Sequence, residues 1–79
     1  MSFPIRNGSR YRAEIHLSGI ETWASNATVR QKLEEAGFGR VVVKGYGGKR
    51  IAEGVWLGES VEDAVHLIPS QVYSVEEVS

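Results

Sequence analysis

The sequence predicts one small α+β domain, and three observations lead to this fold class. The chain has 79 residues, which is the length of a single domain. Apolar and polar residues alternate over 10–18 and again over 72–78, a pattern typical of strands that are buried on one face. Residues 25–36 instead place apolar side chains at helical spacing. Strands and helices therefore alternate along the chain.

The first strand and the first helix have the clearest signals. One face of the strand over 10–18 is formed by Tyr11, Ala13, Ile15 and Leu17. In the helix over 25–36, Ser25 or Asn26 can cap the first turn. Its buried stripe consists of Val29, Leu33 and Ala36. Gly37 is the expected stop, and Phe38 is expected to fold back onto the core.

The second half of the chain predicts a hairpin, a short helix and a last strand. The β-branched run in 40–46 is typical of a strand, Gly47-Gly48 indicates a tight turn, and 51–57 returns as the partner. Ser60 can cap a helix over 61–67 that Pro69 ends, although 61–68 can also be extended. The last strand is expected over 72–78, which completes the order β-α-β-β-α-β.

This order predicts a four-stranded antiparallel sheet with both helices on one face and the other face open. The domain is expected to span 9–79. Residues 1–8 have a proline, an Asn-Gly turn signal and no periodicity, so they are expected to form a flexible N-terminal arm. Phe3 and Ile5 of this arm can still dock on the body.

Three stretches resemble RNA-recognition-motif domains. Residues Ile15-His16-Leu17-Ser18-Gly19-Ile20 resemble the first-strand motif of that family, and the helix that ends Leu33-Glu34-Glu35-Ala36-Gly37-Phe38 is similar in position to its first helix. Residues 54–64, Gly54-Val55-Trp56-Leu57-Gly58-Glu59-Ser60-Val61-Glu62-Asp63-Ala64, resemble its third strand and second helix. The resemblance implies a ferredoxin-like βαββαβ plait.

The same resemblance gives little support for RNA binding. Members of the family stack bases on aromatic side chains of the first and third strands. The first-strand position is His16 here, whereas Glu53 and Val55 stand at the third-strand positions and offer no ring.

Composition excludes several kinds of chemistry. Without cysteine the chain has no disulfide, no thiolate metal site and no cysteine nucleophile. His16 and His66 lie far apart and have no acid at ligand spacing, so no metal and no cofactor are expected. Acid pairs such as Glu34-Glu35 are neighbours and do not converge on a substrate, and no nucleophile motif surrounds a serine. We expect no enzyme.

The charges are segregated along the chain. Residues 1–50 contain all nine Lys and Arg and four acids, a net charge of +5, whereas 51–79 contain six acids and no Lys or Arg, a net charge of −6. Such asymmetry indicates either a partner surface or two halves that neutralise each other in the fold.

No apolar run reaches the length of a membrane span, and residues 1–8 lack the apolar region of a signal peptide, so a cytoplasmic protein is expected.

Candidate partner-binding residues lie on the open face and the hairpin. On the first strand Arg10, Arg12 and His16 point to the open face, and the hairpin stretch 44–50 combines three cations with an exposed aromatic residue. Trp56 either joins an aromatic patch or is core. The full set is Arg10, Arg12, His16, Lys44, Tyr46, Lys49, Arg50 and Trp56.

These residues predict a non-enzymatic protein-binding module: an adaptor, an inhibitor or an accessory subunit of a larger assembly. A viral or phage accessory protein is one setting that fits. The partner is expected to be another protein or a second copy of the chain in a homo-oligomer, and no membrane is expected. The alternative is a single-stranded RNA- or DNA-binding domain that uses the open sheet face and the basic hairpin.

Overall fold

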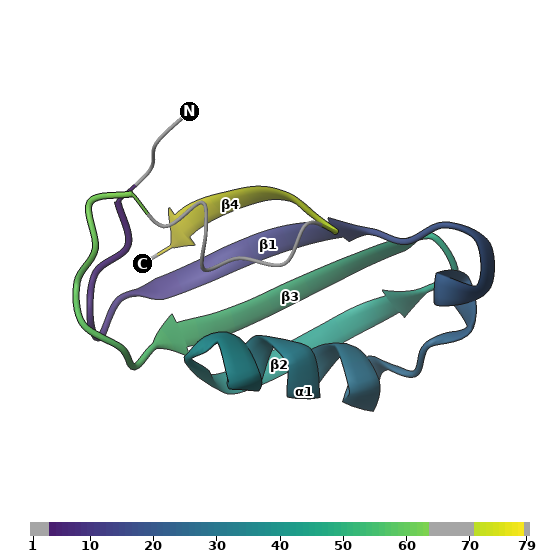
Figure 1. The fold of residues 1–79 in the computed structure, drawn as a ribbon, viewed down its shortest axis with the longest axis horizontal. Helices are drawn as coiled ribbons and strands as arrows, with labels where there is room; N and C mark the ends of the chain where they lie inside the picture. Colours follow the sequence, from purple (N-terminus) through teal and green to yellow (C-terminus); the bar gives the residue numbers. More distant parts are fainter. Residues whose placement is uncertain (1–3, 64–70, 79) are drawn as a thin grey trace.

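A computed structural model describes residues 4–63 and 71–78 as a small α+β fold (Figure 1). The elements follow in the order β1 (Arg10–His16), a 3₁₀ turn η1 (Gly19–Trp23), α1 (Asn26–Ala36), β2 (Phe38–Tyr46), β3 (Lys49–Trp56) and β4 (Val72–Val78). The four predicted strands and the first helix are thus confirmed. Strands β2 and β3 each begin two residues earlier than the sequence predicted.

The four strands form one antiparallel sheet in the order β2-β3-β1-β4. Strands β1 and β3 lie in the centre, and β2 and β4 lie at the edges. Helix α1 packs against one face along β2, and the opposite face carries no described element (Figure 1). This arrangement gives the open sheet face that the element order predicted.

Helix α1 begins and ends where the chain supplies caps. The Ser25 hydroxyl accepts a hydrogen bond from the backbone N–H of Thr28 at 3.1 Å, so Ser25 is the N-cap. Gly37 follows the last turn with φ 123°, a conformation that side chains rarely adopt. Val29 and Leu33 are buried as predicted, and they fix the face of α1 that packs on the sheet.

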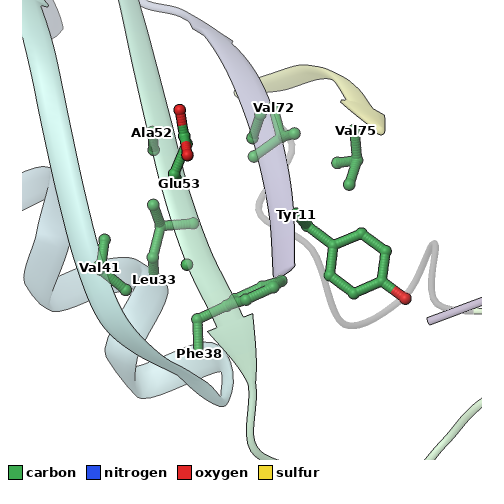
Figure 2. Close-up of a pocket in the computed structure, with 10 residues that line it drawn as sticks. Tyr11, Leu33, Phe38, Val41, Ala52, Glu53, Val72 and Val75 are labelled. Carbon is green, nitrogen blue, oxygen red and sulfur yellow. The ribbon is translucent and has the colours of Figure 1, made fainter. Parts of the chain in front are cut away.

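The core lies between α1 and the sheet. Its buried members are Ile5, Tyr11, Ile15, Val29, Leu33, Phe38, Val41, Ala52 and Trp56. Phe38 folds onto Trp56 as an edge-to-face pair with ring centroids 5.0 Å apart. Figure 2 shows Leu33 of α1, Phe38 of β2 and Tyr11 of β1 around a cavity of about 20 Å³. A cavity of that size is too small for an organic ligand.

The second helix was predicted over 61–67, and its first residues are not helical. Residues 61–63 lie outside any helix, and Val61 forms a short antiparallel bridge with Ile5. The two backbone hydrogen bonds of this bridge, each 2.8 Å long, replace the first helical turn. The remainder of the predicted helix, 64–67, lies outside the described residues.

The N-terminal segment is anchored over residues 4–8. Ile5 is 0% exposed, so it docks on the body of the domain as its apolar side chain suggested. The Asn7 side chain donates hydrogen bonds to the carbonyls of Leu57 at 3.2 Å and Gly58 at 2.8 Å. The backbone N–H of Arg6 donates to the Tyr11 hydroxyl at 2.7 Å. Residues 4–8 therefore pack as part of the domain, and the arm predicted over 1–8 is not free in this part.

Candidate binding surfaces on the open face and at the hairpin end

Six of the eight predicted site residues lie on the open face. Alternation in β1 places Arg10, Arg12, Glu14 and His16 there, and the strand register sets Lys49 of β3 and Lys44 and Tyr46 of β2 beside them. All of these cations and aromatic residues are exposed. The structure therefore brings together Arg10, Arg12, His16, Lys44, Tyr46 and Lys49 on one face of the sheet.

Arg50 and Trp56 are corrections to the predicted site. They lie on the opposite face of β3, with 3% and 4% of their surface exposed. Trp56 is core, and its indole N–H donates to the Glu59 carbonyl at 2.8 Å. The Arg50 guanidinium donates to the Gly47 carbonyl at 3.3 Å, the Asn26 side chain at 2.9 Å and the Thr22 carbonyl at 3.0 Å. Neither side chain can contact a partner from this position.

The guanidinium groups of β1 are paired with acids of the neighbouring strands. Arg12 lies 3.3 Å from Glu53 of β3 and 3.7 Å from Glu76 of β4, because the register places both opposite it. Arg10 lies 3.8 Å from Glu53. Each pair is exposed to water and contributes less than about 1 kcal/mol. The basic and acidic halves of the chain thus intermix on this face and partly neutralise each other.

One residue from each strand forms a row across the end of the open face. In register, Tyr46 of β2 lies opposite Lys49 of β3, and Lys49 lies opposite His16 of β1. Tyr73 of β4 completes the row by stacking on His16, with ring centroids 4.3 Å apart and an interplanar angle of 12°. We call Tyr46, Lys49, His16 and Tyr73 the aromatic row.

Tyr73 reaches this face because of an irregularity in β4. The register pairs Glu14 with Ser74 and Ile15 with Val72, so Tyr73 is an extra residue between two paired positions. Regular alternation from Ser74 would direct Tyr73 to the helix-covered face. The bulge reverses that direction, which is why sequence alternation missed this residue.

Glu14 connects His16 and Lys49 within this surface. The His16 Nε2 lies 2.5 Å from the Glu14 carboxylate, and the Lys49 ammonium lies 3.7 Å from it. Since an ionised carboxylate only accepts, Nε2 carries the proton of this hydrogen bond. The hydrogen bond from His16, aided by the charge of Lys49, lowers the pKa of Glu14 below its ordinary value.

Three large apolar side chains are exposed where η1 meets the hairpin turn. Ile20, Trp23 and Tyr46 are 82%, 86% and 90% exposed. The backbone N–H of Leu17 donates to the Gly48 carbonyl at 2.9 Å, and Arg50 reaches the Thr22 carbonyl, so η1 lies against the β2–β3 turn. We call Ile20, Trp23 and Tyr46 the end patch.

Trp23 faces solvent although it lies between β1 and α1, beside the core. Residues of η1 have no period that separates a buried face from a wet one, so sequence pattern could not place Ile20 and Trp23. Their only signal was the presence of two large apolar side chains in a turn.

No three His, Cys, Asp and Glu side chains of the described residues are close enough together to hold a metal ion. A hollow of about 340 Å³ between α1 and the sheet is mainly apolar, with Glu21 and Lys32 as its ionisable residues. Hydrogen bonds from Gln71 at 2.8 Å and from the Ser18 N–H at 3.1 Å occupy the Glu21 carboxylate and lower its pKa. His66 lies outside the described residues.

Comparison with protein-family models, with curated proteins and with solved structures found no match. Within residues 4–63 and 71–78, no helix combines the length and the apolar character needed to cross a membrane.

Proposed function

We propose that this chain is a non-enzymatic protein-binding module whose partner docks on the end patch of Ile20, Trp23 and Tyr46. One observation carries the proposal: these are the most exposed large apolar side chains of the described residues, and the elements that carry them, η1 and the β2–β3 hairpin, meet at one end of the sheet. Tryptophan and tyrosine supply much of the binding energy in protein interfaces. An apolar cluster of this kind on a small domain marks an interaction site.

The test compares capture by three forms of the protein. The variant Trp23→Ala with Tyr46→Ala removes two members of the end patch, and Leu57→Ala truncates an apolar side chain that is also exposed but lies at the other end of β3. Quantitative affinity capture from the native host should yield proteins retained by wild type and by L57A and lost from the double variant. Equal thermal unfolding of all three forms is the control for folding.

Identical capture by all three forms would contradict the proposal. Size-exclusion mass is measured on the same preparations, because self-association through the end patch would make the partner a second copy of the chain. In that case the double variant elutes as a smaller species than wild type and L57A.

A second candidate function, single-stranded nucleic-acid binding, is favoured by the aromatic row. Exposed rings beside Lys49 can stack bases while the cation contacts phosphate. Against it, Arg10 and Arg12 share their charge with Glu53 and Glu76. The variant Tyr73→Ala distinguishes the two functions, since it cuts the row and leaves the end patch whole. Oligonucleotide binding that falls steeply with salt and is weakened by Y73A supports this candidate, and no binding at low salt excludes it.

We also propose that the chain forms a ferredoxin-like βαββαβ plait. Its support is the central position of β1 and β3, the hairpin of β2 and β3, and the sequence signal for a helix before Pro69. Backbone chemical shifts of residues 64–68 test this proposal. Helical values support the plait, and extended values contradict it.

A further inference from the structure

A hollow on the open face is lined by three cations. Arg10 of β1, Arg40 and Lys44 of β2, and Glu53 of β3 surround Val42 and Ile51, two apolar residues of neighbouring strands. We call these six residues the basic hollow. Its volume of about 190 Å³ is below the usual 300–1,000 Å³ of organic-ligand pockets, so it suits a small polyatomic ion.

The charges of the basic hollow are only partly compensated. Among the described residues, Arg40 and Lys44 take part in no ion pair of the structure. Arg10 has a long contact of 3.8 Å with Glu53, whose other carboxylate oxygen lies 3.3 Å from Arg12. Three cations therefore face one carboxylate that is shared with a fourth cation, and the hollow has an excess of positive charge.

The backbone of β2 holds Arg40 at this place at a conformational cost. Arg40 has φ 52° and is the one described residue other than glycine with a positive φ. It lies where the register with β3 shifts between Gly39 and Val42, so a bulge directs its side chain. Such a backbone persists only where the surrounding structure determines it, and it occurs often at binding sites.

We infer that the basic hollow binds a phosphate-type dianion. Arg40 and Arg10 offer planar guanidinium donors that match a tetrahedral oxyanion, and Lys44 adds a point charge. Val42 and Ile51 supply the apolar part of the lining. The inference goes beyond protein binding, because none of these residues belongs to the end patch. Either proposal can fail without the other.

Titration with inorganic phosphate, followed by amide chemical shifts, tests the site. Sodium chloride at equal ionic strength is the reference, since it reveals shifts caused by screening alone. The expected shifts are confined to residues 40–44 and 51–53. Equal shifts with chloride, or shifts spread over unrelated cations, would overturn the inference.

The variant Arg40→Gly with Lys44→Ala gives the test its specificity. Glycine relaxes the positive φ, so this protein should fold while phosphate affinity falls by roughly tenfold or more. Lys32→Ala removes a cation from α1, on the other side of the sheet, and should change the affinity by less than about twofold. Equal losses in both proteins would show a general charge effect and reject the site.

Three probes identify the source of the anion. Inorganic phosphate, phosphoserine and adenosine monophosphate present the same group on different carriers. Equal affinities support a site that reads only the phosphate group, and a tighter phosphoserine or nucleotide supports that carrier as the source. No shift with any of the three at saturating concentration overturns the inference.

Discussion

Arg50 donates a hydrogen bond from Nη1 to the side-chain oxygen of Asn26 at 2.9 Å, which joins the β2–β3 hairpin to the first turn of α1. The same guanidinium reaches the carbonyls of Thr22 and Gly47, and the Asn26 amide donates in turn to the Gly45 carbonyl at 3.0 Å. The hairpin, η1 and α1 are thereby tied at one end of the sheet.

Removing the Arg50 guanidinium should destabilise the fold. Arg50→Ala leaves three acceptors without their donor in a buried place, so the free energy of unfolding should fall by about 2–4 kcal/mol. Lys49→Ala, which truncates the exposed neighbour, should change it by less than about 0.5 kcal/mol. Urea unfolding measures both values. Similar stabilities of the two variants would show that Arg50 is not the residue that ties this end.

Gly37 should tolerate no side chain, because Trp56 occupies the space beside it. A Cβ at Gly37 would lie 2.7 Å from the Trp56 ring, at φ 123°, so Gly37→Ala should cost about 2–4 kcal/mol. Gly47→Ala is the matched control, since φ there is 69° and nothing lies within 4 Å. It should cost only the backbone term, about 1–2 kcal/mol. Thermal unfolding that ranks the two variants equally would contradict the Trp56 contact.

The hydrogen bond between His16 and Glu14 should be visible in the titration of Glu14. The lowered pKa of Glu14 means that its contribution to stability is present above the ordinary glutamate pKa and is lost as the pH falls through the lowered value. His16→Ala should raise the pKa of Glu14 toward its ordinary value. Carboxyl carbon NMR shifts against pH measure it.

Tyr73→Ala is the control for this titration, because it removes the stacked ring and leaves the hydrogen bond in place. The pKa of Glu14 should stay lowered in that variant. A rise of the Glu14 pKa in Y73A as large as in H16A would assign the shift to packing of the imidazole and not to its N–H.

The N-terminal segment should contribute to stability through Ile5. Ile5→Ala removes a side chain that is completely buried and should lower the free energy of unfolding by about 2–5 kcal/mol. Arg6→Ala, at the next and exposed position, should leave it nearly unchanged. Equal effects of the two substitutions would show that this segment is a free arm, as its composition suggested.

Elements with regular patterns could be predicted from the sequence. The alternation of β1, the Ser25 cap, the Gly37 stop and the turn at Gly47-Gly48 all specify local structure, and each lies where it was expected. These signals are local, because they depend on the period and on the backbone freedom of a few neighbouring residues. The opposite charges of the two halves also indicated that the halves could neutralise each other in the fold. Ion pairs such as Arg12 with Glu76 show this arrangement.

The candidate sites depended on features without a period. Arg50 lies on the same buried face of β3 as Ala52 and Trp56, although its charge suggested an exposed position. The acceptors that allow its burial come from segments far away in the sequence, so no local pattern revealed them. Tyr73 changed face through a bulge, and Trp23 lies in a short 3₁₀ turn. Such positions are set by tertiary contacts, so one sequence could not fix them.

Strand β4 is held to the described sheet by one neighbour, β1, whereas β1 and β3 each have two. Edge strands of this kind open locally before the rest of a domain unfolds. In hydrogen exchange, the amides of β4 should therefore lose their protons earlier than those of β1 and β3. Since Tyr73 lies on β4, its ring stacks on His16 only while β4 is paired with β1. The aromatic row therefore persists only as long as this strand stays in the sheet.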